Sequence, residues 1–255
     1  MAARLTTPSL RVDGLSALVT GAGRGIGLAA AHALAQAGAV VTLVARSAQE
    51  IDAAAADIRA QGSQAIAHKL DVTDAGAVTA FVAQHGPFDI LVNNAGTNRP
   101  SRITDMTDAD YDAVMDLNVK ATMFVTREVT RGLIGAGKPG SIITISSQMG
   151  HVGGPKRALY CATKHAVEGM TKALAWELGP HGIRANTVCP TFIETAMTEK
   201  MFADADFRQY VESRIALGRL ARLEDIMGAV VFLASDASAM VTGSALMVDG
   251  GWTAA

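Results

Sequence analysis

The chain has 255 residues, of which 49% are apolar and 18% charged, and its formal net charge is −2. These values are ordinary for a globular protein with a sizeable hydrophobic core. The nearly neutral balance gives no general attraction to nucleic acid or to an anionic membrane, and we expect neither as a partner.

Apolar runs of strand length alternate along the chain with longer segments at helical spacing, which is typical of βα units. In chain order, the strands are predicted at 15–20, 40–45, 65–70, 90–93, 141–145, 184–188 and 246–248. The first helix is predicted to run from a glycine-rich turn to near 38, and the second to end by 62. Further helices are predicted over 75–86, after 107, over 160–178 and over 224–234. Because the strands are continuous apolar runs, we expect helices on both faces of the sheet. The sequence therefore predicts a single α/β domain over 1–255, with a doubly wound, Rossmann-type parallel sheet of seven strands.

Two segments between the regular βα units have features of their own. The helix predicted after 107 has Thr107 as its expected N-cap. Its apolar face comprises Val114, Leu117, Ala121 and Phe124. Segment 192–220 is polar and fits the alternation poorly, and long irregular connections are often lids, so we expect a lid there. Within it, three residues either cover an apolar substrate or pack in the lid: Met197, Met201 and Phe202.

A glycine-rich turn, Thr20-Gly21-Ala22-Gly23-Arg24-Gly25-Ile26-Gly27, joins the first predicted strand to the first helix. Glycines allow a tight turn and let backbone amides approach phosphate oxygens, and the helix behind adds unpaired N–H groups and the positive end of its dipole. In a doubly wound sheet this first βα turn is where a dinucleotide binds. Taken alone, the turn is equally a flexible connection, and its spacing differs from the G-x-G-x-x-G fingerprint.

Four further motifs follow the glycine turn. Asn93-Asn94-Ala95-Gly96 ends the fourth predicted strand, and Asn118 lies in Leu117-Asn118-Val119. Ser147 follows the fifth strand and precedes Tyr160-Cys161-Ala162-Thr163-Lys164 by thirteen residues. Together these motifs resemble the short-chain dehydrogenase/reductase family, which reads T-G-x-x-x-G-x-G, N-N-A-G, Asn, Ser and Y-x-x-x-K in this order. The resemblance runs from about 15 to 252 and implies an NAD(P)-dependent oxidoreductase acting on a carbonyl or a secondary alcohol.

Tyr160 and Lys164 are four residues apart, hence neighbours on one face of the predicted helix. A free tyrosine, with a pKa of about 10, is a poor base near neutral pH, and a nearby cation lowers that pKa. The resemblance implies Tyr160 as the general acid/base, with Lys164 lowering its pKa and binding the ribose of the nicotinamide. It also implies Ser147 as the residue that polarises the substrate oxygen and Asn118 as one that positions a water in a proton relay. Ser146 competes for the serine role, but on an extended strand its side chain faces the other way.

The resemblance also implies a set of cofactor contacts. They are Gly21, Arg24, Gly25, Ile26, Gly27, Arg46, Asp71, Val72, Asn94, Ala95, Gly96, Tyr160, Lys164, Pro190, Ile193 and Thr195. Thr191 stands where the family usually has a glycine after the proline, so the backbone there is expected to differ somewhat. Asp71 is alternatively a helix-entry aspartate, and Asn94 is better suited to support the sheet than to contact substrate.

The choice between NAD and NADP depends on the end of the second strand. NAD sites usually place an acidic side chain there to bind the ribose 2′-hydroxyl. Here Ala45 is followed by Arg46, and Arg24 stands in the glycine turn nearby. Two guanidinium groups and no carboxylate suit a 2′-phosphate, so we expect NADP, with NAD also possible. If both arginines are only solvated, this preference disappears.

The substrate pocket is expected to be lined by segments 97–102, 148–159 and 192–217. The second of these contains Lys156 and Arg157, which suit a polar or anionic substrate such as a sugar acid, unless both side chains point into water. His151 is equally a surface residue or a ligand contact.

Three other functions fit the sequence less well than this one. A ketoreductase acting on acyl-carrier thioesters needs a basic docking patch, for which the sequence offers only scattered residues. A non-catalytic dinucleotide-sensing regulator would lack part of the Ser147, Tyr160 and Lys164 set, which is complete here. An epimerase or dehydratase of the longer related family usually needs a larger C-terminal domain.

Cysteine usage and targeting signals bear on the compartment. Cys161 and Cys189 offer at most one disulfide and no metal-ligand spacing, so we expect free thiols and no metal. Neither a signal peptide nor an apolar run of membrane-spanning length is evident, which favours the cytoplasm. The family resemblance implies a homo-oligomer, commonly a tetramer.

Overall fold

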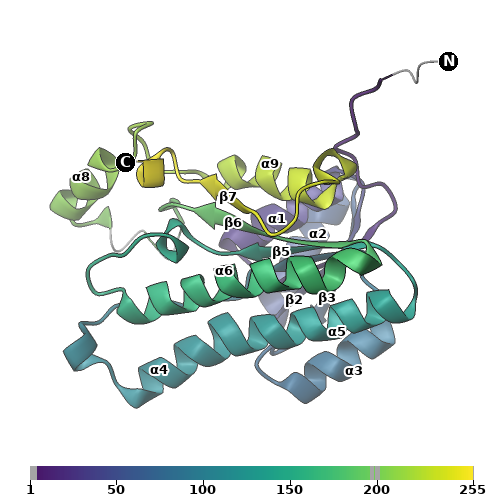
Figure 1. Ribbon diagram of the computed structural model, residues 1–255, viewed down its shortest axis with the longest axis horizontal. Helices are drawn as coiled ribbons and strands as arrows, with labels where there is room; N and C mark the ends of the chain where they lie inside the picture. The colour runs from purple at the N-terminus through teal and green to yellow at the C-terminus, as the bar shows by residue number, and fades with distance from the viewer. Residues whose placement is uncertain (1–4, 196–197, 199–201, 255) are drawn as a thin grey trace.

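Seven parallel strands form one sheet in the computed structural model, which describes residues 5–195, 198 and 202–254. The strands are β1 (Ser16–Thr20), β2 (Val40–Ala45), β3 (Gln64–Lys69), β4 (Ile90–Asn93), β5 (Gly140–Ile145), β6 (Ile183–Pro190) and β7 (Ala245–Val248). Their order across the sheet is β3-β2-β1-β4-β5-β6-β7 (Figure 1). The chain therefore winds outward in both directions from β1 and β4, which is the arrangement of a doubly wound fold.

Helices cover both faces of this sheet (Figure 1). One layer comprises α1 (Gly25–Gln36), α2 (Ala48–Ala60) and α9 (Leu223–Ala234), and the other α3 (Ala75–His85), α4 (Asp108–Met115), α5 (Thr122–Gly135) and α6 (Ala158–Leu178). Each layer closes a hydrophobic cluster against the strands, the first containing Leu34 and Ile226 and the second Val129 and Leu178. The predicted seven-stranded α/β sheet is thus confirmed. Among the described residues, no helix combines the length and the apolar character that a membrane crossing requires.

The helix predicted after Thr107 differs from expectation in its register. Thr107 accepts a hydrogen bond from the Asp110 N–H and caps α4 as expected. A π-helical turn then spans Asp116–Ala121, and its extra residue per turn rotates the following helix. As a result Val125 lies in the core, whereas Phe124, expected there, is half-buried with the Arg127 guanidinium 4.6 Å from its ring centre.

The expectation of an irregular segment over 192–220 is wrong between Ala205 and Ser213, which form helix α8. Asp204 caps this helix by accepting hydrogen bonds from two backbone N–H groups. Val211 is buried in a small separate cluster against which the Phe192 and Phe207 rings pack, 5.9 Å apart. α8 therefore forms a compact element at the end of the sheet, near the C-terminus (Figure 1).

The three expected lid residues differ in what can be said of them. Met197 and Met201 lie outside the described residues. Phe202 packs within the small cluster, its ring centre 6.0 Å from that of Phe192.

Candidate active site

The loops that follow the strands at their carboxyl ends meet at one edge of the sheet. Within the described part of the chain, four buried side-chain atoms have no hydrogen-bond partner: Asn98 Oδ1, Ser146 Oγ, Arg157 Nη1 and Thr191 Oγ1. All four lie in the loops that follow β4, β5 and β6. Buried polar groups are nearly always paired, so their concentration at one edge indicates a site that takes up a polar molecule.

The glycine turn is held in place by Asn94 from the neighbouring loop. The Asn94 side-chain amide donates to the carbonyl oxygens of Thr20 (2.9 Å) and Gly21 (3.1 Å). A Cβ added at Gly27 would collide with that same amide, so this position requires glycine. Gly25, with φ of +58°, has open space where a Cβ would be, at the N-terminus of α1. This turn offers a phosphate both an open backbone and the positive end of a helix dipole.

The Asn-Asn-Ala-Gly loop after β4 is tied to the first strand. The Thr20 hydroxyl accepts hydrogen bonds from the backbone N–H groups of Asn94 (3.0 Å) and Ala95 (3.1 Å). With its side chain committed to the glycine turn, Asn94 has the supporting position that the sequence favours. A Cβ at Gly96 would lie 3.3 Å from Asn118 Oδ1, which brings this loop against the π-helical turn.

Asn118 is buried in that π-helical turn, and its side chain is fully used within the protein. Its Oδ1 accepts from the Thr97 N–H (2.8 Å), and its Nδ2 donates to the Thr97 carbonyl (2.9 Å) and to Thr163 Oγ1 (3.1 Å). The carbonyl oxygen of Asn118 accepts from the Thr122 hydroxyl. Asn118 therefore joins the loop after β4 to α6, and its side chain positions these elements.

Ser147, Tyr160 and Lys164 converge at the end of β5. Lys164 Nζ donates to the carbonyl oxygen of Ile145 (2.8 Å) and lies 5.5 Å from the centre of the Tyr160 ring. Ser147 Oγ accepts from the Met149 N–H (3.1 Å), which fixes the hydroxyl at the start of the loop. The neighbouring Ser146 lies against Gly150, where an added Cβ would be 3.0 Å from its Oγ.

Burial dominates the electrostatics of these groups. It raises the pKa of the Tyr160 phenol, while a hydrogen bond with Ser147 and the positive charge of Arg157 act in the opposite direction. Burial also lowers the pKa of Lys164 to about 8, although Cys189 and Glu168 oppose the change. The expectation that Lys164 lowers the pKa of Tyr160 is therefore not met, because desolvation prevails and the cation acting on the phenol is Arg157.

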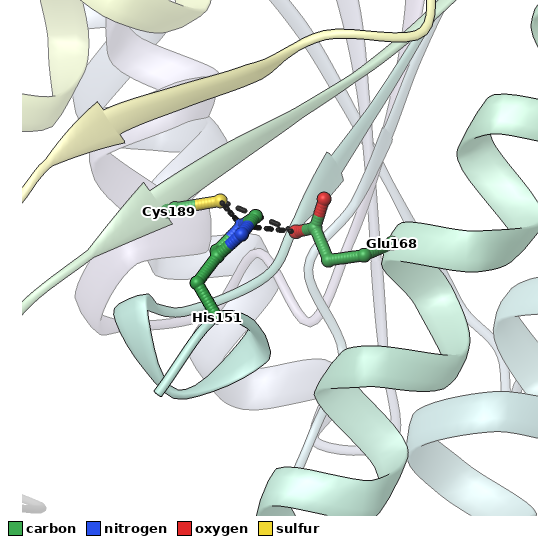
Figure 2. A group of neighbouring side chains, drawn as sticks. All are labelled: His151, Glu168 and Cys189. Atoms are coloured by element: carbon green, nitrogen blue, oxygen red, sulfur yellow. Dashed lines mark hydrogen bonds and ion pairs between the residues drawn. The ribbon is translucent and has the colours of Figure 1, made fainter. Parts of the chain in front are cut away.

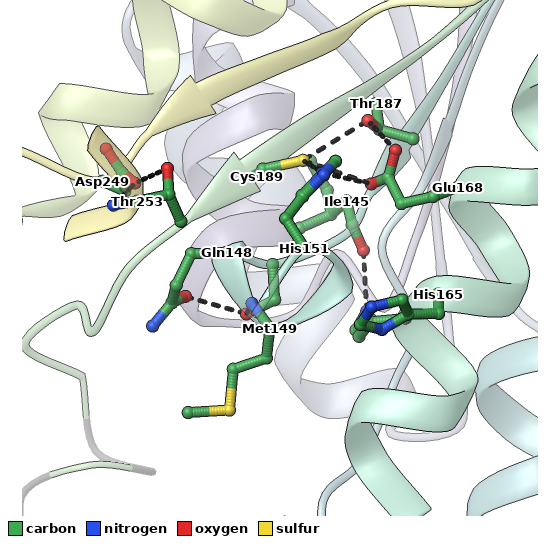
Figure 3. A network of polar contacts seen from close by, with 12 residues as sticks. Ile145, Gln148, Met149, His151, His165, Glu168, Thr187, Cys189, Asp249 and Thr253 are labelled. Carbon is green, nitrogen blue, oxygen red and sulfur yellow. Dashed lines mark hydrogen bonds and ion pairs between the residues drawn. The ribbon is translucent and has the colours of Figure 1, made fainter. Parts of the chain in front are cut away.

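A polar network of Glu168, Thr187, Cys189 and His151 joins α6, β6 and the loop after β5 (Figure 3). Glu168 is one helical turn after Lys164 on α6 and accepts hydrogen bonds from Thr187 Oγ1 (3.1 Å) and Cys189 Sγ (3.2 Å). His151 Nε2 lies 3.5 Å from both Glu168 Oε1 and Cys189 Sγ (Figure 2). Burial raises the pKa of Cys189 to about 12, so the thiol keeps its proton.

The same His151, Glu168 and Cys189 atoms lie within 4.8 Å of one another and form the one group among the described residues that could hold a metal ion. Their mutual contacts also account for their positions without an ion. Sequence reasoning missed this group because its members come from three separate segments with no metal-ligand spacing.

Arg24 and Arg46, which are expected to bind the 2′-phosphate of NADP, are both exposed. Arg24 immediately precedes α1, and its guanidinium lies 3.4 Å from Glu50 Oε1. Arg46 follows β2, and its charge contributes to the lowered pKa of Asp71, which is set mainly by hydrogen bonds from Thr73. Asp71 is thus a turn residue, and Asp74 is the N-cap of α3. Val72, beside Asp71, is buried in the core.

β6 ends at Pro190, and Thr191 follows it. The Thr191 N–H donates to the Val248 carbonyl (3.3 Å), which continues the pairing of β6 with β7. The φ of Thr191 is not positive, so this position accepts threonine where the family usually has glycine. Ile193 is buried and forms a parallel bridge with Ala221. The Thr195 N–H donates to Thr198 Oγ1 (3.0 Å).

The loop between β5 and α6 separates its two cations. Lys156 is exposed, so its side chain points into water, and its backbone φ is +59°. Arg157 is only 8% exposed, so the alternative that both side chains point into water is wrong for this residue.

Comparisons with known proteins agree over nearly the whole chain. A family model described as enoyl-(acyl carrier protein) reductase matches residues 21–253. Gluconate 5-dehydrogenase of Gluconobacter oxydans is 42% identical over 246 residues, covering 95% of this chain and 96% of that protein. L-xylulose reductase of Bos taurus is 39% identical, covering 96% of this chain and 99% of that one. A solved gluconate 5-dehydrogenase from Burkholderia cenocepacia, in complex with NADP and tartrate, superposes with a TM-score of 0.92 at 38% identity, covering 96% and 98% of the two chains.

Proposed function

The chain belongs to the short-chain dehydrogenase/reductase family, and we propose that it moves a hydride between NADP and a carbonyl or secondary alcohol of a sugar or sugar acid. The observation that carries this proposal is the convergence of Ser147, Tyr160 and Lys164 at the sheet edge where the unpaired buried polar atoms gather. The named relatives act on gluconate and on L-xylulose, which supports a polyhydroxylated substrate.

The glycine turn and its surroundings fit a dinucleotide. Gly25 and the N-terminus of α1 would receive the pyrophosphate, because the space above the turn is open there. Arg24 and Arg46, both exposed beside it, would bind the 2′-phosphate, Arg24 by leaving its long 3.4 Å contact with Glu50. Thr191, with its unpaired hydroxyl, stands beside the residues that would face the nicotinamide end. When bound, the nicotinamide supplies or accepts the hydride.

Contacts from other parts of the chain would complete the cofactor site. They are Gly21, Ile26, Gly27, Asp71, Val72, Asn94, Ala95, Gly96, Pro190, Ile193 and Thr195, with Tyr160 and Lys164 at the nicotinamide ribose. Several of these act by holding the backbone in place, as Asn94 does for the turn.

Tyr160 would transfer the proton. In the reductive direction its hydroxyl hydrogen passes to the carbonyl oxygen as the electron pair of the C=O bond moves onto that oxygen. Burial favours the protonated phenol and so keeps Tyr160 ready to donate at neutral pH. Ser147, which lowers the pKa of the same phenol, would orient the substrate oxygen, and Lys164, with a pKa of about 8, can release a proton in the working range. Asn118 would support this relay by fixing α6 against the loop after β4.

A panel of ketoses, polyols and sugar acids, followed by the absorbance of reduced nicotinamide with NADP and NAD, tests the activity. Tyr160→Phe should lower kcat by about 10²- to 10⁴-fold, the usual worth of a general acid/base. Tyr111→Phe is the matched control, because Tyr111 is 45% exposed on α4. Unchanged turnover in Tyr160→Phe with every substrate would reject the assignment. Preferred reduction of acetoacetyl thioesters would instead favour an acyl-carrier ketoreductase.

We also propose a homo-oligomer, with a tetramer as the family's common form, and a cytoplasmic location. Trp176 is 87% exposed beside a shallow hollow lined by Lys172, Pro180 and Thr242, which supports a covered surface on α6. Both cysteines are free, which supports a reducing compartment. Light scattering measures the first, and fractionation of the native cell measures the second.

A further inference from the structure

We infer that Arg157 binds the carboxylate of an acidic substrate, so that the enzyme acts on sugar acids in preference to neutral sugars. This inference rests on the proposed function, since it assigns the substrate class of the same site. Arg157 precedes α6 directly and stands three residues before Tyr160, at the sheet edge where the reacting groups converge.

One nitrogen of the Arg157 guanidinium is buried without a partner. Its residue is 8% exposed, and Nη1 has no hydrogen bond to any residue that the structure describes. It also forms no ion pair with a described carboxylate. A buried cationic nitrogen without an acceptor is unfavourable, and an anion bound there would remove that cost.

Arg184 also has a largely desolvated head group, and it shows what a structural arginine looks like in this fold. Its Nη1 donates to Ser238 Oγ (2.9 Å), and its Nη2 lies 3.3 Å from the Ser235 carbonyl oxygen. Both nitrogens are therefore used within the protein. Arg157 differs from it in having a buried nitrogen left over.

The arginine stem lies close to Gly154 and Met149 in the same loop. A Cβ added at Gly154 would lie 3.5 Å from Arg157 Cγ and 2.9 Å from Met149 Cε, which shows that the stem packs against this loop. Arg157 is the N-cap residue of α6, and Tyr160 stands three residues later in the first turn, so both side chains start from the same end of the helix. A ligand held by Arg157 therefore lies next to the acid/base.

A carboxylate is the group that suits this position. A guanidinium presents N–H donors in a planar fork that matches the two oxygens of a carboxylate, and such paired contacts give both strength and orientation. A neutral hydroxyl would leave the buried charge uncompensated. The carboxylate would thus fix one end of a sugar acid while Ser147 and Tyr160 receive the reacting oxygen.

The test compares each acid with its own amide, which has the same shape without the charge. Wild type, Arg157→Gln, Arg157→Lys and Lys156→Asn are assayed with four- to six-carbon aldonates, including D-gluconate, and with the matching aldonamides. Lys156→Asn is the control, because it removes an exposed cation one residue away, and asparagine tolerates the left-handed backbone there. NADPH affinity of each variant is measured by the fluorescence of the bound cofactor.

We expect wild type to prefer at least one aldonate over its amide. Arg157→Gln should lower kcat/KM for that acid about 100-fold, the scale for removing one partner of a buried charge pair, with less than about a threefold change for the amide. Arg157→Lys should retain part of the preference, because it keeps the charge but loses the fork. Lys156→Asn and the NADPH affinities should stay within about twofold of wild type.

Three results would overturn the inference. If Arg157→Gln lowers kcat/KM equally for the acid and the amide and shifts the pH–rate profile, Arg157 acts only on the pKa of Tyr160. A large loss of NADPH affinity would place the anion on the cofactor. Turnover of neutral ketoses with no preference for any aldonate would leave the proposed function intact and remove Arg157 from substrate selection. Absence of turnover with every acid, amide and ketose would instead reject the proposed function itself.

Discussion

Replacement of Lys164 by Met should change how the stability of the protein depends on pH. Burial lowers the pKa of Lys164 from 10.5 to about 8 in the folded state. Between these values the unfolded chain holds a proton that the folded protein has lost, so the wild type gains stability as pH rises. Below about pH 8 both states are protonated and the charged ammonium is desolvated at full cost. The 2.5-unit difference corresponds to at most about 3 kcal/mol of destabilisation at neutral pH.

The change in the free energy of unfolding that can be measured is smaller, because other groups also titrate at alkaline pH. Between pH 7 and about 9.5 the linkage relation gives the wild type a gain of about 2 kcal/mol relative to Lys164→Met. The range stops there because the raised pKa of Tyr160 acts in the opposite direction at higher pH.

Urea unfolding at pH 7, 8, 9 and 9.5, at one protein concentration and without cofactor, measures this difference. Lys69→Met is the matched control, since it removes an exposed lysine at the end of β3. A difference in the free energy of unfolding between wild type and Lys164→Met that stays constant across the series would refute the reasoning. Lys164 would then have the same pKa in the folded and unfolded states.

Three other perturbations follow from the geometry. Arg24→Ala and Arg46→Ala should each raise the KM for NADPH about tenfold and change the KM for NADH little, and parallel losses with both cofactors would contradict the 2′-phosphate assignment. Gly27→Ala should lower the free energy of unfolding by about 1–3 kcal/mol, because its Cβ collides with the Asn94 amide, which urea unfolding would measure. Glu168→Gln should move the alkaline limb of the pH–rate profile to lower pH, because the carboxylate holds Lys164 in its charged form. An unmoved limb would show that Glu168 only maintains packing.

The sequence predicts the sheet well because its strands are buried on both faces and leave a continuous apolar signal. β2 and β4 have the predicted bounds, and the remaining strands differ by one or two residues at their ends. Local rules were also sufficient for Thr107, whose side chain caps the helix that follows it. In contrast, helix α8 was missed, although Asp204 and the four-residue step from Phe207 to Val211 are a cap and an apolar face.

Features that depend on contacts between distant segments were beyond the sequence. The π-helical turn at Asp116–Ala121 rotates α5 and moves Val125 into the core, which the 3.6-residue period cannot foresee. The motifs identify Tyr160 and Lys164 but not their pKa values, because burial is a property of the folded chain. Arg157 is the clearest case, since its sequence neighbour Lys156 is exposed and only folding distinguishes the two cations.

The two cations of the site, Lys164 and Arg157, differ in whether their charge changes with pH. Lys164, with a pKa of about 8, changes charge within the working range, whereas a guanidinium remains charged throughout. The positive charge of Arg157 opposes the rise in the pKa of Tyr160, so it favours phenolate. A carboxylate bound to Arg157 would neutralise that charge and raise the pKa of Tyr160 further. In reduction, an acidic substrate would thereby keep the phenol in the form that donates to a ketone, whereas in oxidation of an aldonate it would raise the pH at which the accepting phenolate forms.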